Sequence, residues 1–176
     1  MKRFSLILTL ILSFSCAHHI DEKHLTEKVT IAGTLEGSQY KNIYFAAQPK
    51  NKDYKKLAEA GFKTVINLRD KSEYKEDVES WLVQKKYKMN YVNIPFKKDM
   101  ELNDSYVDEV FDAVKKYKSE GKVLLHCSSG NRVGAFLAAH FHRHHKMNKE
   151  NSLETAKKLG LKKEGAIKKV ERYFSK

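Results

Sequence analysis

The sequence predicts a single α/β domain with a central, mostly parallel sheet flanked by helices. Three observations support this fold class: strand-like and helix-like stretches alternate, an apolar stretch near residue 125 leads into a glycine-containing loop, and a helix-like stretch follows that loop. The 176 residues suffice for one hydrophobic core and are few for two. We therefore expect one folded unit over residues 29–176.

Five short stretches rich in β-branched and aromatic residues are expected to form the sheet, at residues 29–35, 42–46, 64–68, 90–95 and 122–127. Helices are expected between and after them, at residues 53–60, 73–86, 105–119, 133–146, 152–159 and 164–174. In the second of these helices Val78, Trp81 and Leu82 share one face. We predict that this face packs on the core.

The first 17 residues have the organisation of an export signal: Lys2 and Arg3, then an apolar stretch, then small residues. A membrane-spanning helix is the alternative, but it needs about 20 apolar residues and this stretch is shorter. Ser15 followed by Cys16 resembles the lipobox of bacterial lipoproteins, although Leu12 lies one position too early. Ser15 and Ala17 are small residues separated by one position, and they also fit the small-x-small rule of ordinary signal peptidase.

Of these two routes we favour cleavage near Cys16 and lipidation of that cysteine. The mature protein is then expected to be exported, either periplasmic or anchored to a membrane of the bacterial envelope through Cys16. Residues 18–28 are polar and are predicted to form a flexible linker before the domain.

The formal net charge of +12 favours anionic partners. No nucleic-acid-binding motif and no basic stripe interleaved with aromatic residues occurs in the sequence, so we predict no nucleic-acid partner. A phosphorylated substrate, either a protein or a small molecule, or an acidic envelope surface fits this charge better. Solubility alone is the alternative reason for so many lysines.

Residues 124–134, LLHCSSGNRVG, are expected to join the end of an apolar strand to the start of a helix. Backbone N–H groups and the helix dipole attract an anion at such a junction. The same field favours the thiolate form of Cys127, the candidate nucleophile, and Arg132 can donate to two phosphate oxygens. The alternative is a buried and inert cysteine. The residues expected to bind phosphate are Ser128, Ser129, Gly130, Asn131 and Arg132.

These residues resemble the cysteine-dependent phosphatases related to protein tyrosine and dual-specificity phosphatases, whose loop runs His-Cys, five residues, Arg. Only four residues separate Cys127 from Arg132, and this shorter loop is similar to a bacterial dual-specificity-phosphatase-like branch in which HCxSGNRVGA recurs. The likeness continues in YFAAQP at 44–49, LAEAGFKTVINLR at 57–69 and YVNIPF at 91–96.

The resemblance implies a phosphomonoester hydrolase that works through a phosphocysteine intermediate, without a metal or cofactor. Two departures from the family pattern bear on activity. The loop is one residue shorter, and Val133 stands where the family has Ser or Thr. A catalytically impaired phosphate-binding pseudophosphatase is therefore one alternative.

The resemblance also implies a general acid, an Asp on a loop roughly thirty residues before the cysteine. Asp99 fits this position, and Asp104 is the competitor that we expect to cap the next helix instead. Lys97 and Lys98 can add positive charge at the mouth of the pocket.

Three further residues are expected to support the site. His126 is predicted to orient the loop by hydrogen bonding rather than to titrate in the reaction. Arg69 and Glu73 follow another strand, and we predict that they form a buried ion pair that shapes the pocket. Direct phosphate contact by Arg69 is the alternative.

Two local patterns in the sequence suggest other functions. Rhodanese-like sulfurtransferases also carry a cysteine, four residues and an arginine in their loop, but the GHIPGA stretch typical of them is absent here. His140 and His144 have a spacing that can bind zinc on a helix, but no nearby carboxylate or cysteine completes a site. We therefore predict no metal site.

Overall fold

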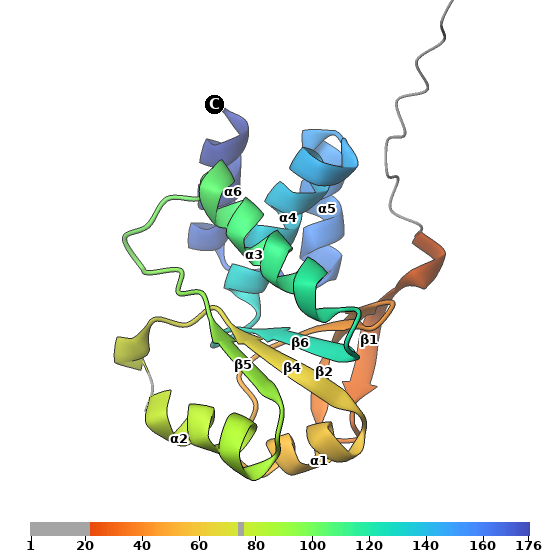
Figure 1. The fold of residues 1–176 in the computed structure, drawn as a ribbon. Helices are drawn as coiled ribbons and strands as arrows, with labels where there is room; N and C mark the ends of the chain where they lie inside the picture. The colour runs from red at the N-terminus through yellow and green to blue at the C-terminus, as the bar shows by residue number, and fades with distance from the viewer. Residues whose placement is uncertain (1–21, 74–75) are drawn as a thin grey trace, which may run out of the picture.

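The structure is a computed structural model that describes residues 22–73 and 76–176. Its strands are β1 (Leu25–Ile31), β2 (Leu35–Tyr40), β3 (Ile43–Ala46), β4 (Phe62–Asn67), β5 (Asn90–Asn93) and β6 (Lys122–His126). They form one sheet in the order β1-β2-β3-β6-β4-β5 (Figure 1). The pairs from β3 to β5 are parallel, and β1, β2 and β3 pair antiparallel. The predicted fold class is thus confirmed.

The predicted signal peptide, including Cys16, lies outside the described residues. None of the helices in the described ranges is long and apolar enough to cross a membrane.

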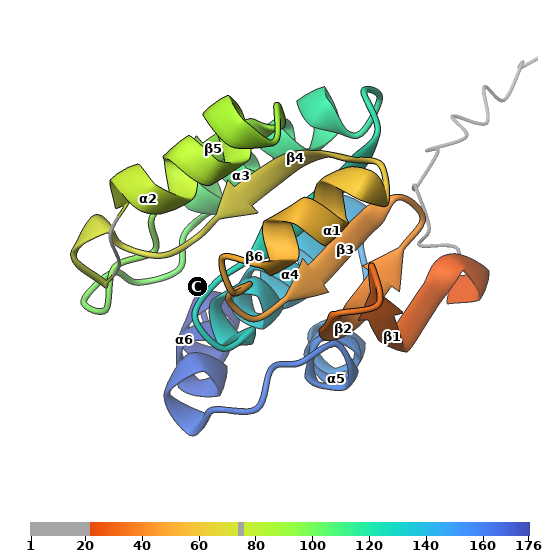
Figure 2. The same cartoon turned by 90° about the horizontal axis from the view of Figure 1, so that it is seen from below.

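The helices form a layer on each face of the sheet. They are α1 (Asp53–Glu59), α2 (Glu76–Ser80), α3 (Asp104–Tyr117), α4 (Asn131–His145), α5 (Lys149–Lys158) and α6 (Glu164–Phe174), with shorter turns η1 (Glu22–His24) and η2 (Lys71–Glu73) and a π-helical segment η3 (Trp81–Lys86). Figures 1 and 2 show α1 and α2 on one face and α3 to α6 on the other.

The central strands supply side chains to both layers because successive residues of a strand point to opposite faces. On β6, Val123 and Leu125 pack with α3 and α4, whereas Leu124 packs on the side of α1. On β4, Ile66 packs with α3 and α4, and Val65 packs on the side of α1. Strands buried on both faces are typical of parallel sheets covered by helices.

The first strand differs from the prediction. Instead of one strand over 29–35, residues Leu25–Ile31 and Leu35–Tyr40 form an antiparallel hairpin. Residues 25–28 of the predicted linker belong to its first strand, and residues 18–21 of that linker lie outside the described residues. Ala32 and Gly33, with φ of 51° and 66°, make its turn, and the Thr34 amide donates to the Ile31 carbonyl at 3.0 Å. Positive φ at both central positions matches the right-handed twist of a hairpin.

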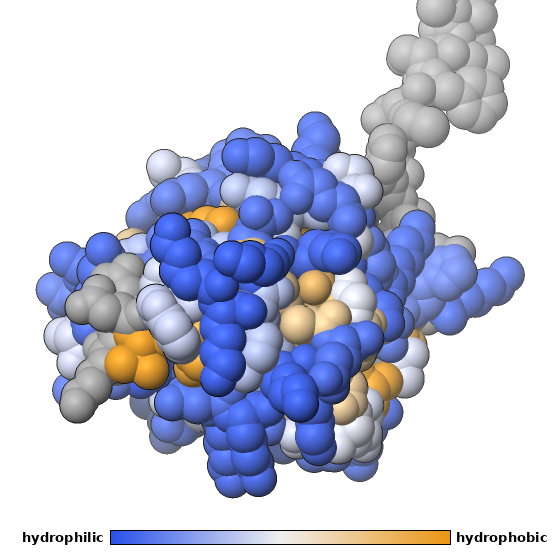
Figure 3. All heavy atoms as spheres, turned by 60° about the horizontal axis from the view of Figure 1, so that its bottom comes forward, coloured by the Kyte–Doolittle hydropathy of each residue, from blue (hydrophilic) through white to orange (hydrophobic). Residues whose placement is uncertain are grey.

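The helix predicted over 73–86 also differs. It begins as α2 and continues as the π-helical segment η3, in which the Tyr87 amide donates to the Leu82 carbonyl at 3.0 Å. Val78 and Trp81 are 42% and 55% exposed, so of the predicted face only Leu82 packs on the core. Glu79 shares the buried side with Leu82. The face of the molecule in Figure 3 is mostly hydrophilic, and the hydrophobic patches on it are small and separate.

The parallel strands bring four connecting segments to one edge of the sheet. Asn67 at the end of β4 pairs with His126 at the end of β6, and the Leu68 amide donates to the His126 carbonyl at 2.9 Å. The Phe96 amide, after β5, donates to the Leu68 carbonyl at 3.1 Å. The segments that follow β3, β4, β5 and β6 therefore meet where ligands bind in α/β sheets.

Candidate active site

The loop after β6, residues 127–131, curls around the sulfur of Cys127. Gly130 has φ of 83°, a conformation that favours glycine, and its amide lies 3.1 Å from Cys127 Sγ as a hydrogen-bond donor. The helix α4 begins at the next residue, so its N-terminal end faces the sulfur. Cys127 is a free cysteine and is 1% exposed. The N-terminal end of a helix attracts negatively charged groups, so an anionic ligand fits beside Cys127 Sγ.

Asn131 ties this loop to the segment before α6. Its Oδ1 accepts from the backbone amides of Lys162 and Lys163 at 2.8 and 2.6 Å, and its Nδ2 donates to Ser129 Oγ at 3.2 Å. The Asn131 side chain therefore holds the loop, and the predicted role of this residue in binding phosphate stays a prediction.

Close packing one turn later depends on Gly134, where an added Cβ would lie 2.9 Å from the Leu161 backbone. The sequence order Asn-Arg-Val-Gly therefore combines a loop anchor with a close helix contact.

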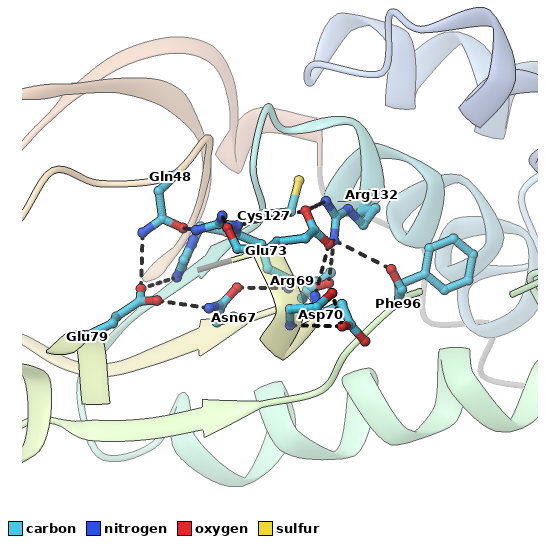
Figure 4. Close-up of polar contacts among 12 residues, drawn as sticks. Gln48, Asn67, Arg69, Asp70, Glu73, Glu79, Phe96, Cys127 and Arg132 are labelled. Atoms are coloured by element: carbon cyan, nitrogen blue, oxygen red, sulfur yellow. Dashed lines mark hydrogen bonds and ion pairs between the residues drawn. The ribbon is translucent and has the colours of Figure 1, made fainter. Parts of the chain in front are cut away.

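Arg132 points its guanidinium toward the segment after β4 and binds Glu73 with both terminal nitrogens. Nη1 and Nη2 donate to Oε1 and Oε2 at 2.6 and 2.5 Å (Figure 4). The hydrogen bond from Arg132 lowers the pKa of Glu73 below its usual range. Glu73 thus takes the bidentate position that a phosphate would take.

The predicted ion pair between Arg69 and Glu73 is long, with 4.0 Å between Nε and Oε2. The Arg69 guanidinium instead donates to Gln48 Oε1 at 2.7 Å and to the Glu73 carbonyl oxygen. Arg69 does not line the pocket described below. Its contacts fit a role in holding Gln48 and the Glu73 segment, and Glu73 is primarily the partner of Arg132.

A buried carboxylate, Glu79, lies beneath the site and was missed from the sequence. Its oxygens accept from Gln48 Nε2 at 3.2 Å and Asn67 Nδ2 at 3.0 Å, and also from the Tyr54 hydroxyl. His126 Nε2 lies 3.1 Å from Glu79 Oε1. Burial by itself would raise the pKa of Glu79, but His126, Tyr54 and Gln48 outweigh it and lower that pKa.

Through these contacts Glu79 connects the site from below. His126 precedes the nucleophile, and its Nε2 contacts Glu79. Gln48 links Glu79 to Arg69 (Figure 4). The backbone amide of Gln48 also donates to the Ser128 carbonyl at 3.3 Å. The predicted orienting role of His126 remains a prediction, and its partner in that role is Glu79 rather than a loop residue. A signal was present in the sequence, since Glu79 lies three and four residues before Leu82 and Val83, on one helical face.

A pocket of about 990 Å³ opens beside the loop. Three segments and the start of α6 line it: Asp70, Ser72, Glu73, Phe96, Lys97, Lys98, Asp99, Ser128, Ser129, Asn131, Arg132, Ala135, Lys163, Gly165, Ala166 and Lys169. The structure therefore brings the predicted acid Asp99 to one cavity with four of the predicted phosphate ligands, Ser128, Ser129, Asn131 and Arg132. The fifth, Gly130, is not among the lining residues. Lysine side chains around it make the cavity attractive to anions.

Asp104, the competing acid, lies elsewhere. The cap of α3 is Asn103, whose Oδ1 accepts from the Tyr106 amide at 3.0 Å, so the predicted cap at Asp104 was wrong by one residue. Asp104 instead accepts from Arg143 and from the Tyr173 hydroxyl, both at 2.6 Å. It is not among the residues that line the pocket.

The histidines of α4 pack with aromatic rings. His140 and His144 lie with ring centroids 5.0 and 4.3 Å from Phe111, and His144 Nε2 is 3.0 Å from Asp108 Oδ1. Burial, with the charges of His145 and His144, lowers the pKa of His140 to about 3. Within the described residues, no group of three or more His, Cys, Asp or Glu could hold a metal ion.

Known structures share this fold. TpbA of P. aeruginosa superposes with a TM-score of 0.65 and 23% identity over 84% of this chain and 88% of that chain. Kinase associated phosphatase matches with a TM-score of 0.64 and 13% identity, covering 86% and 94% of the two chains. A DUF442 protein of Shewanella putrefaciens gives 0.57 and 21% identity, covering 86% and 93%.

The comparison of sequences identifies the family. No curated protein matches the chain. A family model described as the DSP-PTPase phosphatase domain of Swiss Army Knife proteins (PTP-SAK) matches residues 41–172, which include every strand from β3 onward and the Cys127 loop. The chain therefore belongs to this phosphatase family, as the resemblance of its loop implied.

Proposed function

We propose that the protein hydrolyses phosphomonoesters by a thiol mechanism, with Cys127 as nucleophile and a phosphocysteine intermediate. One observation carries this proposal: the Gly130 amide and the N-terminal end of α4 face Cys127 Sγ, while the Arg132 guanidinium lies at the other end of the same loop. The loop amides and the helix dipole attract the phosphate dianion, and the guanidinium fits two of its oxygens.

The chemistry has two steps. The Cys127 thiolate attacks phosphorus, the ester P–O bond breaks, and Asp99 gives its proton to the leaving oxygen. Water then attacks phosphorus, the S–P bond breaks, Asp99 takes a proton from the water, and inorganic phosphate leaves. The Arg132 guanidinium stabilises the charge on the transferring phosphoryl group in both steps.

Asp99 is tested by the leaving group. We expect Asp99→Asn to lower kcat about 10²- to 10⁴-fold for an alkyl phosphate, whose leaving oxygen needs a proton. The loss should be much smaller for an aryl phosphate with an acidic phenol. Steady-state kinetics with both substrates make the measurement. Asp104→Asn is the control, and a leaving-group-dependent loss in that variant instead would make Asp104 the acid.

A phosphate-binding pseudophosphatase is the second candidate, and two observations favour it. Val133 is buried in the core and supplies no hydroxyl at the start of α4. Glu73 occupies the guanidinium that substrate phosphate needs. Binding without turnover identifies this case: phosphate or vanadate slows alkylation of Cys127 while no phosphomonoester is hydrolysed. The rhodanese alternative has no comparable support, because the family model is that of a phosphatase domain.

The substrate is proposed to be a phosphorylated protein or small molecule. The lysines around the pocket suit either, since both present a phosphate dianion. The TpbA protein has been crystallised in complex with pTyr, and phosphotyrosine is therefore a reasonable first substrate to assay here.

We also propose that the protein is exported and anchored through a lipidated Cys16, because a basic start, an apolar stretch and a cysteine follow in that order. Cys16→Ala is expected to move the protein from the membrane fraction to the soluble periplasmic fraction. Cell fractionation with immunoblotting measures this, and Cys127→Ala is the matched control. A mature, unlipidated N-terminus at His18 would instead show ordinary signal-peptidase cleavage.

A further inference from the structure

Asp99 lies in a tight turn, residues 97–100, which we name the Asp99 turn. The Met100 amide donates to the Lys97 carbonyl at 3.2 Å and closes the turn, and the Lys97 amide lies 3.4 Å from Met100 Sδ. Asp99 is exposed and lines the pocket. An exposed turn of this kind has few contacts of its own, so its orientation depends on what holds it from outside.

One side chain of α6 binds the carbonyl groups of the residues before and after Asp99. The Lys169 ammonium donates to the Lys98 carbonyl at 3.1 Å and to the Met100 carbonyl. The ammonium also lies 5.3 Å from the centroid of the Phe96 ring. The Lys169 side chain is only 18% exposed, and its nearest carboxylate oxygen, Glu101 Oε1, is 3.8 Å away. Its charge is thus directed at the backbone on the two sides of the acid.

Two further side chains, one on α6 and one just after its end, bind the two residues that follow the Asp99 turn. Arg172 Nε and Nη2 donate to the two oxygens of Glu101 at 3.0 and 2.8 Å. Lys176 Nζ donates to the Leu102 carbonyl at 3.4 Å. Positions 169 and 172 are three residues apart and therefore lie on one side of α6, whereas Lys176 follows the end of that helix. The loop from the Asp99 turn to α3 is fastened along α6.

We propose that Lys169 is a positioning residue for the general acid: by binding the carbonyl groups on both sides of Asp99, it sets the direction in which that carboxyl faces the pocket. The inference rests on the proposed role of Asp99. It assigns to Lys169 a task that differs from that of Lys97, Lys98 and Lys163, the other lysines lining the pocket. Lys169 acts through the backbone of the turn and does not touch the reacting atoms.

The test compares Lys169→Met with Lys168→Met. Methionine keeps the length of the stem over Phe96 and removes the ammonium. Lys168 is a matched control because it lies on the same helix, is 59% exposed and pairs with Glu164 at 2.5 Å. We expect Lys169→Met to lower kcat for an alkyl phosphate about 10- to 100-fold and to leave kcat for an activated aryl phosphate nearly unchanged, since only the former needs a well-placed acid. Lys168→Met should change neither rate.

Two further measurements separate positioning from general stability. In an Asp99→Asn background, Lys169→Met should cause no further loss, and Lys169→Arg should restore part of the rate with alkyl phosphate. Equal losses with both substrates, or additive losses in the double variant, would overturn the proposal.

A measurement that does not depend on activity tests the role of Lys169 separately from the proposed function. Amide hydrogen exchange of residues 97–102 should become faster in Lys169→Met and remain as in the wild type in Lys168→Met. A wild-type protein without hydrolysis would refute the proposed function. Unchanged exchange in Lys169→Met would refute the proposal that Lys169 holds the Asp99 turn.

Discussion

Cys127→Ser is expected to abolish phosphomonoester hydrolysis, with kcat falling about 10⁴-fold or more. A serine hydroxyl does not ionise near neutral pH, and among the described residues that line the pocket there is no histidine that could act as its base. The substitution exchanges one small atom for another, and a serine Oγ can accept the same hydrogen bond from the Gly130 amide. The loss of activity should therefore come from the missing nucleophile and not from a change in the fold. Stopped assays of phosphate release from alkyl and aryl phosphates measure it.

The fold and the anion site of the serine variant provide the control. Its midpoint of thermal unfolding should stay close to that of the wild type, and phosphate or vanadate should still raise this midpoint, because Arg132 and the loop amides are unchanged. Retained hydrolysis in the serine variant, or loss of wild-type hydrolysis on adding EDTA, would contradict the thiol mechanism.

The sequence predicted the parts of the site that depend on local signals. Residues 122–127 and 64–68 read as apolar strands, and each is followed by polar residues. Because parallel strands end at the same edge of a sheet, the residues after Asn67 and His126 were expected to meet, and they do. Asp99 reaches the same edge because it follows the neighbouring parallel strand β5.

The parts that were missed depend on contacts between distant segments. A glutamate inside a helix usually faces solvent, and the burial of Glu79 is made favourable by partners on other segments. These partners are Gln48, Tyr54, Asn67 and His126. The hairpin turn at Ala32 was missed because alanine rarely adopts positive φ.

The ion pair at the site shows the same limitation. Arg69 and Glu73 are four residues apart, a spacing that suggests a local pair. Arg132 approaches from α4 with both terminal nitrogens and makes the shorter contacts with Glu73. A bidentate geometry of this kind is stronger than a single long contact, but it is visible only when the two segments are placed together.

Arg132→Lys is expected to lower kcat/KM about 10²- to 10⁴-fold. Lysine keeps the positive charge but cannot donate to two phosphate oxygens in a fixed plane, and it cannot hold both oxygens of Glu73. The lowered pKa keeps Glu73 ionised at neutral pH, so this carboxylate competes with substrate phosphate for whichever cation stands at position 132. Weakened phosphate binding should appear as a higher KM together with a lower kcat.

Arg143→Lys is the matched control for this change, because Arg143 lies on the same helix and is also paired bidentately, with Asp108 at 2.7 Å. That pair is distant from the pocket lining, so its loss should leave kcat/KM unchanged. Protection of Cys127 from alkylation by saturating phosphate provides a second readout, which Arg132→Lys should weaken and Arg143→Lys should preserve. If both variants retain full protection, Arg132 does not bind the phosphate, and the Cys127 loop holds the anion by its backbone amides alone.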